Sequence, residues 1–103
     1  MTENNLYTRF DAVFFEKTRL SILTLLYRDK RVSFKQLKNL LNATDGSLYT
    51  HLQKLLGAGY LTEEKEIVGR DLQTFYTLTD NGATAFREYI DFMETMVKTI
   101  PDR

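Results

Sequence analysis

The sequence predicts a single, mainly α-helical domain with a small β-hairpin, and three observations support this fold class. Apolar residues recur at helical spacing over most of the chain, which predicts amphipathic helices. Residues 61–78 instead contain β-branched and alternating residues around a Gly69-Arg70-Asp71 turn, which is typical of a hairpin. A length of 103 residues suits one domain, 1–103, with a small core.

Composition excludes several classes of protein. The chain has no cysteine and His51 is its one histidine, so disulfides and clusters of thiolate or imidazole metal ligands are excluded. No apolar run is long enough to cross a bilayer, and the start lacks a secretory signal. We therefore expect a cytoplasmic protein with no membrane partner and no cofactor. Fourteen basic and fourteen acidic residues give a formal net charge of zero, which argues mildly against nucleic-acid binding.

The first two predicted helices are rich in apolar side chains. After polar residues 1–5, an apolar stripe at helical spacing indicates a helix that packs in the core and, for some of its members, against a second subunit. A second helix from Lys17 to about Arg28 is apolar around most of its circumference, and a helix of this kind is central to its domain. The stripe of the first helix consists of Leu6, Phe10, Val13 and Phe14.

A helix, a tight connector and a second helix follow. Val32 can form a very short strand, and Ser33 is a good N-cap for a helix from Phe34 to Leu41. The connector then leads into another helix, so residues 34–57 have a helix-turn-helix pattern. The outward side of the first of these helices carries Lys35 and Lys38, and the side chains expected to point inward are Phe34, Leu37, Leu40 and Leu41.

The helix predicted for residues 45–57 is the element around which the chain is organised. Thr44 or Asp45 can cap its start, and Gly57 and Gly59 can end it. A solvated helix face usually carries pairs of Glu and Lys, whereas hydroxyls, an amide and a tyrosine suit base edges and phosphates. A polar surface helix without a partner explains the pattern equally well. The apolar side consists of Leu48, Leu52, Leu55 and Leu56, and the polar side of Gly46, Ser47, Tyr49, Thr50, Gln53 and Lys54.

The last predicted helix runs from about 80 to 99 after a Thr79 cap, and about half of its circumference is apolar. A core contact needs a stripe of only about 100°. One stripe can therefore serve the domain, and the other predicts a homodimer. Alternatively, both stripes lie under the first helix of the same chain. The candidate dimer residues are Leu6, Phe10, Phe14, Tyr89, Phe92, Met93, Met96 and Ile100.

Five segments together resemble small winged-helix transcriptional regulators of the broad MarR, ArsR and PadR group. They are RLSILTLL (19–26), FKQLK (34–38), TDGSL continuing through His51 to Leu55 (44–55), AGYL (58–61) and YTLTDNG (76–82). The resemblance covers roughly residues 17–90. It implies a helix-turn-helix at about 34–57, a DNA-contacting wing at about 61–78, and N- and C-terminal dimerisation helices, the latter at about 80–99.

The resemblance also implies a function and a set of contacts. The helix at 45–57 would enter the major groove of double-stranded DNA, and His51 would pack or hydrogen-bond within the domain. Three glutamates against one lysine in the first wing strand repel phosphates, so we expect the wing to contribute little. The implied DNA-binding residues are Lys35, Thr44, Ser47, Tyr49, Thr50, Gln53, Lys54 and Arg70.

Two other functions compete with sequence-specific DNA binding. A winged helix that binds protein would suit the zero net charge and the acidic wing. An enzyme is disfavoured, because the sequence offers no nucleophile–base pair and no glycine-rich phosphate loop. The sequence leaves open whether a small-molecule effector binds. Phe14, Tyr89 and Phe92 could line such a pocket, although the same aromatic residues suit a dimer core.

Overall fold

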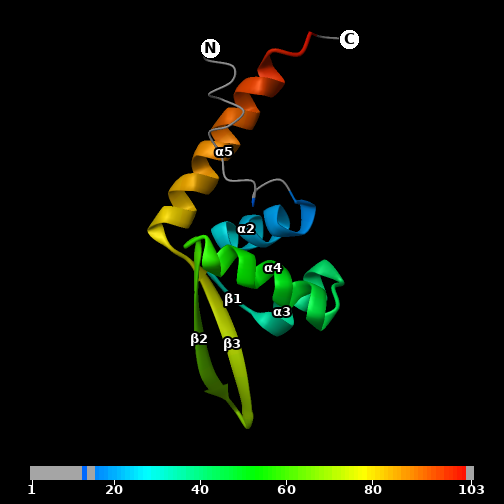
Figure 1. Ribbon diagram of the computed structural model, residues 1–103, viewed down its shortest axis with the longest axis vertical. Coiled ribbons are helices and arrows are strands. Elements are labelled where there is room, and N and C mark those ends of the chain that lie inside the picture. The colour runs from blue at the N-terminus through cyan, green and yellow to red at the C-terminus, as the bar shows by residue number, and fades with distance from the viewer. Residues whose placement is uncertain (1–12, 14–15, 102–103) are drawn as a thin grey trace.

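The computed structural model describes Val13 and residues 16–101, and the predicted dimer residues Leu6, Phe10 and Phe14 lie outside the described residues. The described part is mainly helical with a small antiparallel sheet, as the sequence predicts (Figure 1). Its elements in chain order are α2 (Lys17–Asp29), β1 (Arg31–Ser33), α3 (Phe34–Leu41), α4 (Asp45–Gly57), β2 (Leu61–Val68), β3 (Asp71–Leu78) and α5 (Asp80–Lys98).

Helices α2, α3 and α4, the first half of α5 and one face of the sheet enclose the core. The inner sides of α2, α3 and α4 are apolar at helical spacing, so each helix removes one side from water. The prediction for α3 is wrong at Leu40, whose side chain is 58% exposed, whereas Leu37 is fully buried. The core residues are Ile22, Leu23, Leu26, Val32, Leu37, Leu48, Leu52, Leu55, Tyr60, Leu61, Tyr76, Phe86 and Tyr89.

The sheet has the strand order β1-β3-β2, and both pairs are antiparallel. Val32 on β1 pairs with Tyr76 on β3, and both side chains are buried in the core. The β2–β3 hairpin closes at Gly69 and Arg70, where Gly69 takes a φ of +66° that suits glycine. Because β1 has only three residues, the outer half of the hairpin extends beyond the body of the domain (Figure 1).

Side-chain caps begin α3, α4 and α5 at the residues that the sequence indicates. Ser33 and Gln36 form a capping box at α3, Thr44 accepts from the backbone N–H of Ser47, and Thr79 accepts from that of Gly82. At the other end of α4, Gly59 rather than Gly57 takes the left-handed conformation, with a φ of +82°.

The first turns of α5 pack tightly against the end of α4. Thr79 donates from its backbone N–H to the Tyr60 carbonyl at 3.0 Å and from its hydroxyl to the Gly59 carbonyl at 2.7 Å. Gly82 lies against the same carbonyl, because a Cβ built there would be 2.2 Å from the Tyr60 oxygen. The base of the hairpin, the end of α4 and the start of α5 therefore form one junction.

The later turns of α5 leave the body at the end opposite the hairpin (Figure 1). Phe86 and Tyr89 are buried, whereas Met93 and Met96 are 39% and 38% exposed and Val97 is 61% exposed. We predicted that the two stripes of α5 would serve two different partners. The stripe that contains Phe86 is exposed from Ile90 onward, whereas the stripe that contains Tyr89 is covered as far as Phe92 and exposed at Met96. A second partner for the exposed residues stays a prediction.

Candidate nucleic-acid interface

The outward face of α4 carries the polar side chains that the sequence places there. Ser47, Tyr49, Thr50, Gln53 and Lys54 are all exposed, and Tyr49 is 58% exposed. On the opposite side Leu48, Leu52 and Leu55 are fully buried and Leu56 is partly buried, so packing of the leucines holds the polar face outward.

Two hydroxyls on α4 are engaged by the helix itself. Thr44 Oγ1 accepts from the Ser47 backbone N–H at 3.2 Å, and Thr50 Oγ1 donates to the Gly46 carbonyl at 3.0 Å. The side chains of Gln53 and Lys54, by contrast, make no hydrogen bond or ion pair with other residues in the described part of the chain. Gln53 and Lys54 are therefore available to a ligand, whereas Thr44 serves mainly as the cap.

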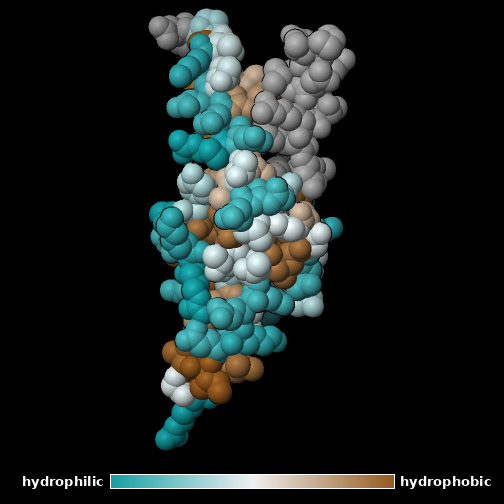
Figure 2. Space-filling view, turned by 90° about the vertical axis from the view of Figure 1, so that its left-hand side faces the viewer, coloured by the Kyte–Doolittle hydropathy of each residue, from teal (hydrophilic) through white to brown (hydrophobic). Residues whose placement is uncertain are grey.

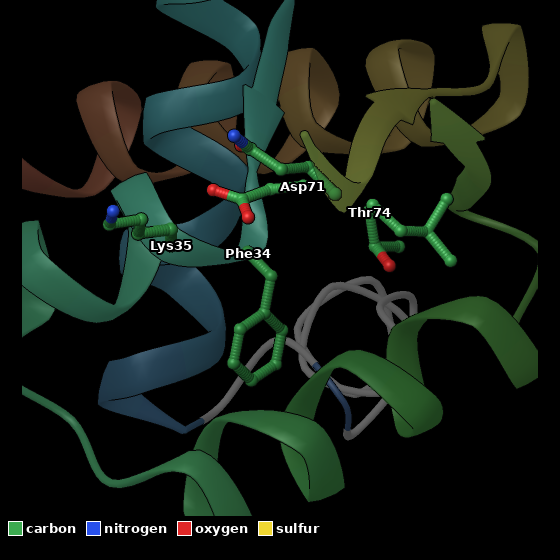
Figure 3. A pocket seen from close by; sticks show the side chains of 6 residues that line it. Phe34, Lys35, Asp71 and Thr74 are labelled. Carbon is green, nitrogen blue, oxygen red and sulfur yellow. The ribbon is translucent and has the colours of Figure 1, made fainter. Parts of the chain in front are cut away.

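The two predicted cations of α3 differ in their surroundings. Lys38 Nζ lies 2.9 Å from Asp45 Oδ1 and so joins α3 to the first turn of α4. Lys35 makes no ion pair with a described residue. It borders an open hollow of about 300 Å³ between the start of α3 and β3 (Figure 3), lined by Phe34, Lys35, Asp71, Leu72, Gln73 and Thr74.

His51 is held inside the domain, which confirms its predicted structural role. Arg19 Nη1 donates to His51 Nδ1 at 3.1 Å, and Glu16 Oε1 lies 3.6 Å from the same nitrogen. Arg19 Nε also donates to the Val13 carbonyl at 2.9 Å. Burial alone would raise the pKa of Glu16, but the backbone N–H of Arg19 and the nearby His51 and Arg19 side chains hold that pKa below its usual value.

The hairpin is less acidic on its surface than its sequence indicates. Arg31 on β1 lies 2.5 Å from Glu66 and 3.4 Å from Glu64, so it neutralises part of their charge. Burial, together with a hydrogen bond to the adjacent Glu63, raises the pKa of Tyr76 to about 12. All three glutamates that we counted against the hairpin therefore have a partner.

The end of the hairpin combines a cation with apolar side chains. Arg70 is exposed at the turn and forms no ion pair among the residues described. Ile67 and Leu72 face each other across the strands and are 72% and 65% exposed, and Val68 is 44% exposed. Figure 2 shows this hydrophobic patch near the end of the hairpin. We did not predict it, although an apolar pair beside a turn is a visible signal in the sequence.

The structure brings some predicted site residues together and keeps others apart. The polar residues of α4 share one helix face, and Lys35 shares the hollow with Asp71 and Leu72 near the end of the hairpin. Arg70 stands apart at the turn. Within the described residues, no three His, Asp or Glu side chains are grouped as metal ligands, and no helix is long and apolar enough to cross a membrane.

A protein family described as a winged helix DNA-binding domain matches residues 18–97. The chain belongs to this family. The predicted resemblance is therefore confirmed, and the fold can be named in the family's terms. Helices α3 and α4 are the helix-turn-helix, with α4 in the position of a recognition helix, and the β2–β3 hairpin is the wing.

Three individual proteins are similar to this chain. The uncharacterized protein MJ0432 of Methanocaldococcus jannaschii is 37% identical over 78 residues, which cover 76% of this chain and 85% of the relative. A transcriptional regulator homologue from Pyrococcus horikoshii OT3 has a similar fold, with a TM-score of 0.79 at 23% identity over 85% of this chain and 87% of the other. Bacillus subtilis PadR, solved in complex with operator DNA, has a TM-score of 0.62 at 26% identity over 70% of this chain and 45% of PadR.

The candidate dimer residues of α5 fall into two groups in this winged-helix domain. Tyr89 is only 8% exposed and Phe92 is partly buried, so both pack mainly within their own chain. Met93, Met96 and Ile100 are exposed, as are two apolar residues that we did not select. Three exposed residues of α5 and one residue just beyond its C-cap repeat at the heptad spacing of a coiled coil, and they are called here the α5 seam: Ile90, Met93, Val97 and Ile100.

Proposed function

We propose that this winged-helix chain is a transcriptional regulator that binds specific sequences of double-stranded DNA as a homodimer. The observation that carries the proposal is the outward face of α4, where the unengaged side chains of Gln53 and Lys54 lie on a helix anchored by fully buried leucines. A major groove about 12 Å wide admits an α-helix, and its base edges distinguish all four base pairs. PadR, a similar structure, was solved with operator DNA, which supports DNA as the partner here.

The side chains of α4 suit two kinds of contact. Gln53 carries an amide, which can form two hydrogen bonds with the major-groove edge of one adenine, and Ser47, Thr50 and Tyr49 can add further base contacts. Lys54 at the end of α4, Lys35 on α3 and Arg70 on the wing suit phosphates, which position the protein. With few cations available, binding should be moderate and should weaken clearly as salt rises.

The α5 seam supports the homodimer. Exposure of apolar side chains at heptad spacing to water is unfavourable. A second copy of the same helix would cover them with the same residues. Two recognition helices related by a two-fold axis would meet successive major grooves about 34 Å apart.

Selection of bound fragments from a random DNA pool tests the proposal. The selected fragments should contain an inverted repeat whose half-sites are about one helical turn apart, or a multiple of it. Selection of one unrepeated half-site would contradict the dimer. No enrichment over the starting pool would contradict specific recognition.

A winged-helix module that binds protein is the alternative. The zero net charge and the exposed apolar end of the wing favour it, because apolar surface of this kind marks interaction sites. Gel-shift titration against mixed DNA fragments separates the two functions, since a protein-binding module should show no salt-sensitive DNA complex.

A further inference from the structure

Arg31 makes a contact that crosses the whole sheet. The Arg31 side chain extends from β1, and its guanidinium carbon lies 3.8 Å from the centre of the Phe75 ring on β3. The guanidinium also donates to Glu66 and Glu64 on β2. Side chains alternate between the faces of a strand, so Arg31 lies on the face opposite Val32 and the core. This outer face of the wing is therefore organised around one cation.

The contact changes the charge that the wing presents. Residues 61–78 carry four carboxylates and two cations, so the addition of Arg31 halves their net negative charge. The side chains of Glu64 and Glu66 are 73% and 51% exposed, so without a partner both charges would act directly on an approaching polyanion. DNA carries one phosphate charge for about every 1.7 Å of helix axis, which makes such repulsion costly.

We propose that Arg31 is a positioning residue for DNA binding, which neutralises Glu64 and Glu66 so that the wing can approach phosphates. Arg31 acts through these glutamates, and it makes no phosphate contact of its own. The inference rests on the proposed function, and it explains how an acidic wing can belong to a DNA-binding domain.

Four variants separate this role from the alternatives. Arg31→Gln should weaken DNA binding by about three- to tenfold at about 50 mM salt, because two carboxylates lose their cation. The loss should shrink at about 300 mM salt, since screening weakens repulsion between exposed charges. The triple variant Arg31→Gln, Glu64→Gln, Glu66→Gln should recover the wild-type affinity. Arg31→Lys should retain most of it.

Arg28→Gln is the matched control. Arg28 forms a comparable exposed ion pair with Asp29 at 2.7 Å, but this pair lies outside the wing. The control loses the same single charge, and its affinity should change by less than about twofold. Thermal unfolding of every variant shows whether the fold is kept, and the affinities are compared among the folded variants.

Each result has a defined meaning. An Arg31→Gln variant that binds like the wild type would overturn the inference. A triple variant as weak as Arg31→Gln would also overturn it, because Arg31 would then contact DNA or brace the hairpin by itself. Failure of the wild-type chain to bind DNA would instead contradict the proposed function.

Discussion

Gln53 lies on the exposed side of α4, where its amide makes no contact with the described residues. In the proposed complex it reads a base, so Gln53→Ala should reduce discrimination at one position of each half-site by about 1–3 kcal/mol. Affinity for unrelated DNA should stay the same, because contacts with phosphates supply the non-specific part of the binding affinity. Competition binding with single-base operator variants measures the effect, and an unchanged operator preference would contradict this role.

Lys54 follows Gln53 directly but is assigned a different contact. Lys54→Ala should weaken binding to all DNA sequences alike and reduce the slope of log affinity against log salt by about 1. Salt titrations of the wild type and the variant on the same fragment provide the measurement. If the two slopes coincide, Lys54 does not contact a phosphate.

Tyr76 links burial to the stability of the wing at high pH. Its pKa in the folded chain is about 12, against about 10 for an ordinary tyrosine. Between these values the unfolded chain loses the proton first, so stability that is present below about pH 10 is lost as the pH rises toward 12. Tyr76→Phe removes this group, so the free energy of unfolding of the variant, measured with urea, should fall less steeply as the pH rises. Identical pH slopes would contradict the assignment.

Local spacing predicts which residues of α4 are buried, but contacts between distant segments were missed. The leucines of α4 recur every three or four residues, and this spacing alone separates them from Gln53 and Lys54. The pairing of Arg31 with Glu66 depends on β1 joining β3, which no local pattern shows. Leu40 has helical spacing for the core, yet it borders an open hollow of about 390 Å³ between α2 and α3.

Gly82 sets how closely the α5 element approaches the body. A methyl group at this position would meet the Tyr60 carbonyl at 2.2 Å, so Gly82→Ala should push α5 outward and lower the free energy of unfolding by about 1–3 kcal/mol. Gly46→Ala is the matched control, because nothing lies within 4 Å of a Cβ built there. Urea unfolding of both variants tests this, and equal stabilities would show that the junction tolerates a side chain.

Element boundaries were predictable because caps and turns act locally. Ser33, Thr44 and Thr79 begin helices where the sequence indicates, and the hairpin closes at the expected turn. The division of α5 was not predictable in the same way. Periodicity identifies the apolar side of a helix, but the size of the body decides where along its length that side becomes exposed.

At the scale of the whole molecule, the wing and the α5 seam lie at opposite ends with α4 between them (Figure 1). A dimer through the seam would leave both recognition helices and both wings accessible. The junction at Gly82 would then set the distance between the two recognition helices, because α5 meets the end of α4 there. In the proposed dimer, the same short contact would thus serve both folding within a chain and half-site spacing between chains.

Val97 provides the test of this assembly. It lies in the seam and is 61% exposed, so Val97→Glu should leave the monomer folded but place a charge in the interface. The variant should sediment as a monomer and bind a full operator much more weakly, because a single half-site supplies fewer contacts. Thr95→Glu, on the polar side of α5, adds the same charge and should remain a dimer. Equal sedimentation of the wild type and Val97→Glu would show that the interface lies elsewhere.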